Sequence, residues 1–342
     1  MKATINDVAK LSGVSIKTVS RVMNNEPSVR QLTREKVQAA VKELNYQPNL
    51  AARNLAGTKS YTVAYIYDNP NAYYIIDMQE GILAACRQQG FELLINPCDS
   101  KRENITEEII NTIKHARIAG VVLTPPFSEQ PEFVKHITAL DVKVVRIMSG
   151  DNAPDELSPC VMVNDREAAQ TITQHLIDLG HKNIAFIAGD AEHMSTIERY
   201  KGYRRALKAN EIEFKKHLVI EGEYSFESGV NGAKQLMAEE VPLGERPSAI
   251  FSCNDEIAAG ALFAARLMNI KIPEQLSIAG FENSPFSRQT WPKLTTADQP
   301  NKQIAKDAAS LLISQVRKQQ NANITSQYIP QLVVRDSTGQ QT

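Results

Sequence analysis

The chain has 342 residues, of which 42% are hydrophobic and 23% charged, and its formal net charge is −1. At roughly 100 to 200 residues per domain the length predicts two or three domains, and the globular composition excludes wholesale disorder or a fibrous repeat. No apolar run approaches the roughly 18 residues of a membrane span, and the N-terminus lacks the apolar core of a signal peptide. We therefore expect a soluble cytoplasmic protein with no membrane partner.

The charge is distributed unevenly along the chain. Residues 1–60 carry ten Lys or Arg against four Asp or Glu, a net charge of +6, and the remainder carries a net charge of −7. A basic terminal module on an acidic body predicts a polyanionic partner for that module alone. The four cysteines lie far apart with no histidine at metal-ligand spacing, which favours reduced thiols and no metal site.

The first 46 residues predict three short helices. Thr4 is suited to cap a helix that ends at Gly13, Ser15 to cap a second helix over 16–24, and Thr33 to cap a third. A helix, a short turn with glycine and a second helix make the spacing of a helix-turn-helix. The small core of this module comes from apolar side chains that recur at helical period.

The outward face of the second predicted helix is polar and basic, opposite Val19, Val22 and Met23. Candidates to contact base edges in a major groove are Ile16, Lys17, Ser20, Arg21 and Asn24. Candidates for phosphate contacts, which position a module without reading sequence, are Thr4, Ser15, Thr18, Ser28, Arg30 and Arg53. The alternative is a basic face that is only solvated.

A short segment, residues 47–60, follows this module. Pro48 disfavours helix at the preceding residue, so the third helix ends before it. Residues 49–57 are compatible with a helix but shorter than the about 12 residues that an isolated helix needs in water. We expect a helix here only when a partner holds it. Leu55 has little apolar surface around it, and packing against a neighbouring domain is one explanation for it.

From Tyr61 onward, β-rich runs alternate with helical patterns. The predicted strands cover 62–67, 92–95, 120–123, 143–147, 160–163, 183–188, 249–253 and 277–281. The predicted helices include 77–89, 166–179, 195–209, 225–238 and 257–268. This alternation predicts an α/β protein with parallel sheets covered by helices on both faces. The length of the segment exceeds one such domain, so we expect two lobes with a cleft between them.

An ordered set of motifs resembles the LacI/GalR family. The motifs are Ala3 to Asn24, Arg53 to Gly57, Glu198 to Tyr203, Cys253 to Asp255, Gly280 to Asn283 and Pro292 to Thr296. The resemblance implies a helix-turn-helix headpiece over 1–46, a hinge helix and linker over 47–60, and a periplasmic-binding-protein-like core over 61–342. Its first lobe would span about 61–160 with a return segment near 297–322, and its second about 161–296 with the C-terminal strand.

The resemblance also implies a function. A member of this family would be a bacterial transcription regulator, here expected to be a repressor, which binds a pseudo-palindromic operator as a homodimer and associates with the nucleoid through DNA. Leu55 would insert between base pairs in the minor groove. The chain's last residues carry no leucine heptad, so we expect a dimer rather than a tetramer.

Ligands of two-lobed folds lie beyond the carboxyl ends of the strands, where loops of both lobes converge. The candidates at those places are Asp68, Asn69, Asn71, Tyr73, Tyr74, Thr124, Asn164, Asp165, Asn254, Asp255, Glu282 and Asn283. The resemblance adds Arg199 as the strongest effector residue and Tyr224 as an aromatic wall, and it assigns sugar hydroxyls to Asn254 and Glu282. Many relatives have aspartate where Glu282 stands, which leaves the preferred sugar open.

Several alternatives remain at this stage. Arg199 could form a salt bridge between the lobes, and the histidines are expected mostly at the surface. The effector would be a sugar or sugar derivative that opposes operator binding, but a corepressor-dependent regulator of a non-sugar metabolite such as a purine is the alternative. No P-loop, GxGxxG, GxSxG or HExxH motif is present, so we expect no catalytic residues, no cofactor and no enzyme.

Overall fold

The computed structural model describes residues 3–23, 28–46, 60–238, 241–319 and 326–341. The chain forms two compact units, Met1–Tyr61 and Thr62–Thr342. Among the helices that lie in the described ranges, none is both long and apolar enough to cross a membrane.

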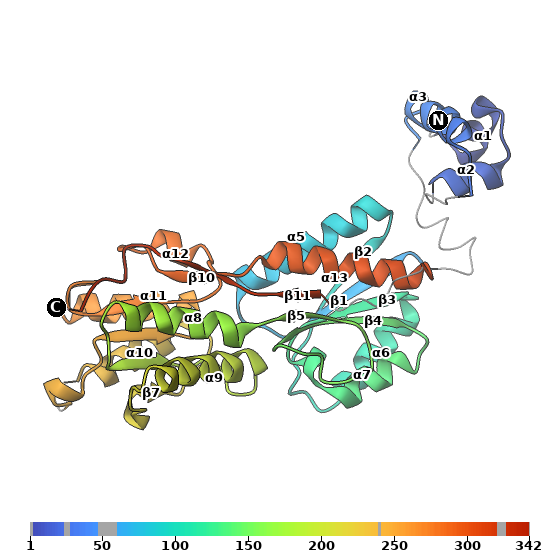
Figure 1. Cartoon of the computed structure of the whole chain (residues 1–342). Coiled ribbons are helices and arrows are strands. Elements are labelled where there is room, and N and C mark those ends of the chain that lie inside the picture. Colours follow the sequence, from blue (N-terminus) through green and yellow to red (C-terminus); the bar gives the residue numbers. More distant parts are fainter. Residues whose placement is uncertain (1–2, 24–27, 47–59, 239–240, 320–325, 342) are drawn as a thin grey trace. The chain divides into compact units, whose positions relative to one another are not determined.

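The smaller unit contains the helices α1 (Ile5–Ser12), α2 (Ile16–Met23) and α3 (Gln31–Glu43) (Figure 1). Thr4 precedes α1, and its N–H and hydroxyl both donate to the Asp7 carboxylate, at 2.8 and 2.7 Å. The helix ends at Gly13, whose φ of 66° is a left-handed conformation that glycine adopts without strain. Three fully buried valines, one from each helix, hold the helices together: Val8, Val19 and Val37.

The third helix begins three residues earlier than a cap at Thr33 predicts. Arg30 is the N-cap of α3, and its carbonyl oxygen accepts the N–H groups of Thr33 and Arg34, at 3.0 and 3.1 Å. Thr33 therefore lies inside the first turn and does not cap the helix. The N-cap side chain makes no capping hydrogen bond here, so the sequence carries no capping signal at the true start.

The larger unit contains two parallel sheets, one in each lobe (Figure 1). The first sheet has the strand order β11-β5-β4-β3-β1-β2, with β1 (Thr62–Tyr67), β2 (Glu92–Pro97), β3 (Gly120–Leu123), β4 (Lys143–Ser149), β5 (Cys160–Val163) and β11 (Ser326–Tyr328). The second has the order β7-β6-β8-β9, with β6 (Ile184–Ile187), β7 (Val219–Ile220), β8 (Ala249–Ser252) and β9 (Ser277–Ala279). The strands β10 (Thr296–Asp298) and β12 (Gln331–Val333) form an antiparallel pair.

Helices cover both sheets. Around the first sheet lie α5 (Ala72–Gln89), α6 (Ile105–His115), α7 (Pro131–Thr138) and α13 (Asn301–Val316), with α5 and α13 side by side (Figure 1). Around the second lie α8 (Asp165–Asp178), α9 (Met194–Ala209), α10 (Phe226–Leu236), α11 (Asp255–Leu267) and α12 (Phe286–Gln289). The pairs α8/α9 and α10/α11 pack closely. At the α8/α9 contact a Cβ on Gly202 would lie 2.2 Å from the Arg166 carbonyl oxygen, so only glycine fits there.

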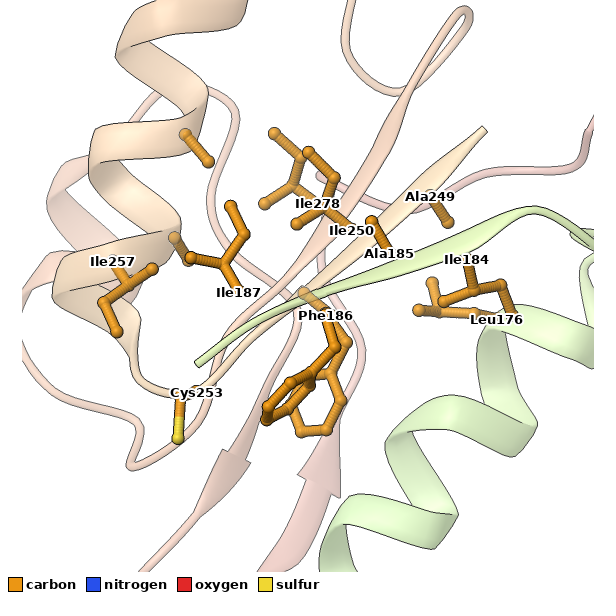
Figure 2. Packing of buried hydrophobic residues seen from close by; sticks show 14 of the residues in the cluster. Leu176, Ile184, Ala185, Phe186, Ile187, Ala249, Ile250, Cys253, Ile257 and Ile278 are labelled. Atoms are coloured by element: carbon orange, nitrogen blue, oxygen red, sulfur yellow. The ribbon is translucent and has the colours of Figure 1, made fainter. Parts of the chain in front are cut away.

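The core of the second lobe is formed by its central strands and the helices beside them (Figure 2). Phe186 of β6 and Phe251 of β8 are fully buried, with ring centroids 5.3 Å apart in an edge-to-face arrangement. Ile187 and Ile257 fill the space between β6 and α11. This core fixes the carboxyl ends of β6, β8 and β9, where the polar residues of the lobe emerge.

All eight predicted strands are present, and the differences from prediction lie at the edges. The short strands β7, β10 and β11 follow no strong pattern and were not predicted individually. Because β5 and β11 pair with each other in the first sheet, that lobe extends to Val163 and its return segment reaches Tyr328, beyond residues 160 and 322. The helix α5 starts at Ala72, five residues before the predicted start.

Candidate functional site

The outer face of α2 is the first candidate surface. Val19 and Val22 are buried, whereas Ile16 is 50% exposed and Lys17 and Arg21 are exposed. Ser20 is partly buried on the same face. The face therefore carries donors and an apolar group of the kinds that read base edges. Asn24, predicted to belong to it, lies outside the described residues.

Three of the hydroxyl groups predicted to contact phosphate, those of Thr4, Ser15 and Thr18, already have local partners. The Ser15 hydroxyl accepts the Thr18 N–H at 3.2 Å and lies 2.9 Å from the Thr18 hydroxyl, and Thr4 bonds to Asp7 as described above. A hydroxyl has a donor and two acceptor sites, so these bonds leave capacity for a further one. Ser28 and Arg30 are exposed. Arg53 and Leu55 lie outside the described residues.

A cavity between the two lobes of the larger unit is the second candidate site. Its free volume is about 50 Å³, and it is lined by residues of both lobes: Asn69, Asn71, Tyr74, Pro125, Ile147, Met148, Ser149, Val163, Asp165, His193, Ser195, Arg199, Tyr224, Glu282 and Gln299. One buried water needs roughly 10 to 15 Å³ of such volume. The cavity therefore has space for a few waters, and a larger ligand requires the lining to move.

Arg199 of α9 lies at the centre of this lining and is 3% exposed. Its Nε donates to Asp165 Oδ1 at 2.7 Å, and its Nη1 donates to the Cys253 carbonyl oxygen at 2.6 Å. The Phe281 ring lies 3.8 Å from its Cζ. Burial opposes the charge of Arg199, but Asp165 and further neighbours hold its pKa well above the ordinary value. The guanidinium group is therefore fixed as a cation.

Glu282 joins the two lobes. One carboxylate oxygen lies 3.6 Å from Arg199 Nη1 in the same lobe, and the other accepts Nδ2–H of Asn71, in the first lobe, at 2.8 Å. Asn71 also caps α5, because its Oδ1 accepts the Tyr74 N–H at 3.1 Å. Burial raises the pKa of Glu282 to about 7, against the lowering effect of Arg199. The ion pairs of Arg199 stay within the second lobe, whereas Glu282 also contacts Asn71 of the first lobe.

Two more hydrogen bonds cross between the lobes. Ser149 at the end of β4 donates to Asp165 Oδ2 at 2.5 Å. The Met194 N–H, in the first turn of α9, donates to Glu129 Oε2 at 3.2 Å. Burial raises the pKa of Glu129 to about 7, and its second carboxylate oxygen has no partner among the described residues. The first lobe thus supplies an acceptor for an unpaired N–H at the start of α9.

Tyr224 forms an aromatic wall of the cavity. Its hydroxyl lies 2.9 Å from the Ser195 hydroxyl and 2.8 Å from the Thr196 hydroxyl, and the His193 ring meets it edge-on at 5.6 Å. The ring lies against Gly189, where a Cβ would come within 2.6 Å of the tyrosine Cζ. Burial lowers the pKa of His193, which favours its neutral form. The glycine is what allows the ring to lie this close to the backbone.

Seven predicted effector candidates do not line the cavity, because each has a structural partner elsewhere. Asn164 caps α8, since its Oδ1 accepts the Glu167 N–H at 3.1 Å, and Asn283 Nδ2 donates to Asp298 at 2.8 Å. Asp68 accepts the Ser100 N–H at 2.8 Å, and Tyr73 lies on α5 with its ring edge-on to Phe286. Thr124 is fully buried, with its hydroxyl 3.4 Å from that of Tyr65.

The other two lie at the start of α11. Asn254 Oδ1 accepts the Ile257 N–H at 2.9 Å and so caps the helix. Asp255 accepts the Thr296 hydroxyl at 2.6 Å and the Ser284 N–H at 2.7 Å. Burial raises the pKa of Asp255 to about 7. Both side chains are fully buried and hold the loops behind the cavity.

Of the predicted effector candidates, the structure brings together Asn69, Asn71, Tyr74, Asp165, Arg199, Tyr224 and Glu282. It adds residues that the sequence did not single out, among them Ser149, His193, Ser195 and Gln299. His193 and Ser149 follow strands, so the rule that ligands lie beyond carboxyl ends could have found them. His181 is also buried, between the hydroxyls of Ser248 and Ser277. His115, His136 and His217 are exposed and His175 is partly buried, so most histidines lie at the surface as expected.

Within the described residues, no group of three or more His, Cys, Asp or Glu is arranged to hold a metal ion. The four cysteines are free thiols, and burial raises the pKa of Cys98 to about 11, which keeps it protonated at neutral pH.

Two family models match the chain. One, described as bacterial regulatory proteins of the lacI family, matches residues 4–49, and one described as a periplasmic binding protein-like domain matches residues 173–338. Catabolite control protein A of Priestia megaterium is 31% identical over 320 residues, which are 93% of this chain and 94% of that protein.

Two solved structures extend the comparison. The lac repressor dimer bound to operator and the anti-inducer ONPF matches with a TM-score of 0.76 and 25% identity, over 99% of this chain and 100% of that chain. The transcriptional regulator CelR in complex with cellobiose matches with a TM-score of 0.73 and 26% identity, over 98% of this chain and 100% of that chain. The likeness therefore covers both compact units.

Proposed function

The chain belongs to the LacI family of DNA-binding transcriptional regulators, which are not enzymes, and we propose that it is a homodimeric repressor released from its operator by a sugar. Residues 1–46 act as the DNA-binding headpiece, 47–60 as the hinge and linker, and the remainder as the effector-binding and dimerisation core. The observation that carries this proposal is the pairing of an exposed, basic α2 face with a polar cavity between two lobes.

The headpiece reads sequence through α2. Lys17 and Arg21 are exposed on one face and can donate to guanine O6 and N7, and Ile16 can pack on a thymine methyl group. The hydroxyls at the start of α1 and α2, together with Ser28, Arg30 and Arg53, contact phosphates and position the module. Leu55 enters the minor groove. Operator affinity then falls steeply with salt, because phosphate contacts release counterions.

A dimer places two headpieces about a two-fold axis, so the operator is pseudo-palindromic. The lac repressor, whose solved structure matches almost the whole chain, is described as a dimer on its operator. The same architecture supports a dimer here.

The cavity takes a sugar. CelR, similar over nearly the whole chain, was solved with cellobiose, and the lining here combines an aromatic wall with an arginine, two carboxylates and amides suited to hydroxyl groups. Its free volume of about 50 Å³ leaves room for a few waters only, so a sugar must change the arrangement of the lobes. Because coupling is reciprocal, a sugar that weakens operator binding by about 1 to 3 kcal/mol is itself bound more weakly on DNA by the same amount.

The test begins with selection of bound duplexes from a random DNA pool by the full chain. We expect an enriched sequence with two inverted half-sites, and sedimentation of a dimer at micromolar concentration. Addition of neutral sugars, phosphorylated sugars and purines to the complex then identifies the effector by the change in operator affinity. If the chain enriches no duplex, the proposal is contradicted. If a purine strengthens operator binding, the protein is a corepressor-dependent regulator and not a sugar-induced one.

A further inference from the structure

The charges around the cavity are unequal. Among the described residues that line it, Arg199 is the one Lys or Arg, whereas Asp165 and Glu282 are both acids. Glu129 adds a third carboxylate where it accepts the Met194 N–H. The cavity therefore has an excess of negative charge whenever these carboxylates are ionised.

Arg199 has five N–H donors, and each of its three nitrogens already faces an acceptor of the protein. Its Nε and Nη1 are bound to Asp165 and to the Cys253 carbonyl oxygen, and Nη2 lies 3.5 Å from Gln299 Oε1. The Phe281 ring covers one face of the guanidinium group. An anionic ligand that took the Nε donor would displace Asp165 and leave a buried carboxylate without its partner, which is strongly unfavourable.

Glu282 is held in the cavity at a conformational cost. Its φ of 98° and the φ of 54° at Asn283 lie in the left-handed region that favours glycine, and such strained positions cluster at functional sites. The carboxylate is directed to Asn71 of the first lobe and to Arg199. A hydroxyl group both donates and accepts, so it can bind to this carboxylate and this amide together, whereas a phosphate or carboxylate ligand offers acceptors only.

We propose that the cleft binds an uncharged sugar and excludes the phosphate ester or uronic acid of the same sugar, and that Glu282 sets this selectivity. The proposal rests on the sugar effector proposed above and narrows it to one charge class. The neutral hydroxyls of the sugar take over the contacts that Glu282 makes with Asn71 and Arg199. A ligand anion, by contrast, comes within a few ångströms of two carboxylates in a site with little water, where like charges repel strongly.

The experiment is calorimetric titration of the full chain at pH 8, above the pKa of about 7 to which burial raises Glu282. The probes are glucose, galactose and ribose, each beside its terminal phosphate ester, together with glucuronic and galacturonic acids. We expect at least one neutral sugar to bind at least tenfold more tightly than its charged partner. If a charged form binds as tightly as its neutral partner, the proposed selectivity is wrong, but the proposal of a sugar effector stands. A chain that binds no probe of either class overturns the sugar effector and this inference with it.

The variant Glu282→Gln tests the assigned residue. It keeps the size of the side chain and an acceptor for Asn71 but removes the charge, so the ratio of the affinities for neutral and charged forms should fall about tenfold. The control Glu274→Gln removes an exposed carboxylate from the same lobe and should leave the ratio unchanged. Thermal unfolding and operator binding confirm that both variants fold. If the Glu282→Gln variant folds and its ratio of affinities for neutral and charged forms equals that of the unchanged protein, the role assigned to Glu282 is wrong.

Discussion

The α2 face and the inter-lobe cavity hold their polar groups in opposite ways. On α2, Lys17 and Arg21 are exposed, whereas Val19 and Val22 of the same helix lie in the core. In the cavity Arg199 and Asp165 are almost fully buried and bound to each other. A binding group on α2 is therefore separable from folding, whereas one in the cavity also holds the lobe together. Substitutions on the α2 face should change DNA binding alone, whereas substitutions in the cavity should change both sugar binding and stability.

The largest effect is expected at Arg199. Arg199→Ala leaves Asp165 and Glu282 buried without their cation, and loss of one partner of a buried ion pair costs about 3 to 5 kcal/mol. We expect the free energy of unfolding of the larger unit to fall by that amount and sugar binding to be lost. Denaturant unfolding of the variant measures the first and calorimetry the second. Lys208→Ala, an exposed change on the same helix, serves as control and should stay within about 0.5 kcal/mol. An unchanged unfolding midpoint for Arg199→Ala would show that the network is not structural.

The complementary change is Arg21→Ala on α2. A bidentate contact to guanine is worth roughly 1 to 3 kcal/mol of discrimination, so the affinity for the selected operator should fall about 5- to 150-fold. Because Arg21 is exposed, stability and sugar binding should not change. Fluorescence anisotropy with the selected duplex and with a scrambled one separates loss of specificity from loss of charge. Lys42→Ala removes one exposed positive charge of α3 and should weaken both duplexes alike. Simultaneous loss of operator and sugar binding in Arg21→Ala would refute the separation.

The contrast between the α2 face and the cavity also explains which parts of the structure can be predicted from the sequence. The helices α1 and α2 begin where local signals place them, since Thr4 and Ser15 lie directly before their first turns. The strands of the larger unit follow from apolar runs between turn residues. The predicted start of α5 at residue 77 is wrong although the Asn71 cap is a local signal of the same kind. The second bond of Asn71, to Glu282, joins positions 211 apart in the chain. A contact at such separation leaves no local pattern.

The cavity shows the same limit in its residues. The rule for carboxyl ends of strands selects Asp68, Asn69, Asp165 and Asn254 alike, because each follows or ends such a segment. Only tertiary contacts decide which of them line the cavity: Asp68 is drawn to Ser100 and Asn254 to the first turn of α11. A polar residue after a strand can either cap the next helix or bind a ligand. Its spacing from the strand does not show which of these two roles it has.

A smaller effect is expected where Tyr224 lies on Gly189. Gly189→Ala places a Cβ within 2.6 Å of the tyrosine ring, and overpacking of this kind typically costs about 1 to 3 kcal/mol. The displaced ring should lose its bonds to Ser195 and Thr196 and weaken sugar binding, with operator binding unchanged. The matched control is Gly244→Ala, where nothing lies within 4 Å of the added Cβ. Equal unfolding midpoints for the two variants would contradict the close packing of the Tyr224 ring on Gly189.

The smallest effect concerns Glu129, whose contact with Met194 crosses between the lobes. Burial raises its pKa from 4.5 to about 7, so the folded protein retains a proton that the unfolded chain releases between these pH values. Its contribution to stability is therefore fully present below pH 4.5 and is lost as the pH rises through about 7. Burial also raises the pKa values of Asp255 and Glu282 to about 7. A variant that lacks only the Glu129 carboxyl should therefore still lose stability between pH 4.5 and pH 7, although by less than the unchanged protein.

Glu129→Gln keeps an acceptor for the Met194 N–H and cannot ionise. Relative to the unchanged protein it should gain stability from pH 5 to pH 8, by on the order of 1 to 2 kcal/mol once solvent screening is allowed for. Denaturant unfolding at several pH values measures this difference. Glu132, exposed and 2.7 Å from Lys135 Nζ, has a lowered pKa, mainly because of its hydrogen bond to Lys135. Glu132 is therefore ionised in both the folded and the unfolded chain from pH 5 to pH 8, and the stability difference between Glu132→Gln and the unchanged protein should not vary over that range. Parallel pH profiles for Glu129→Gln and the unchanged chain would mean that the carboxylate is solvated, and that the first lobe does not hold the start of α9.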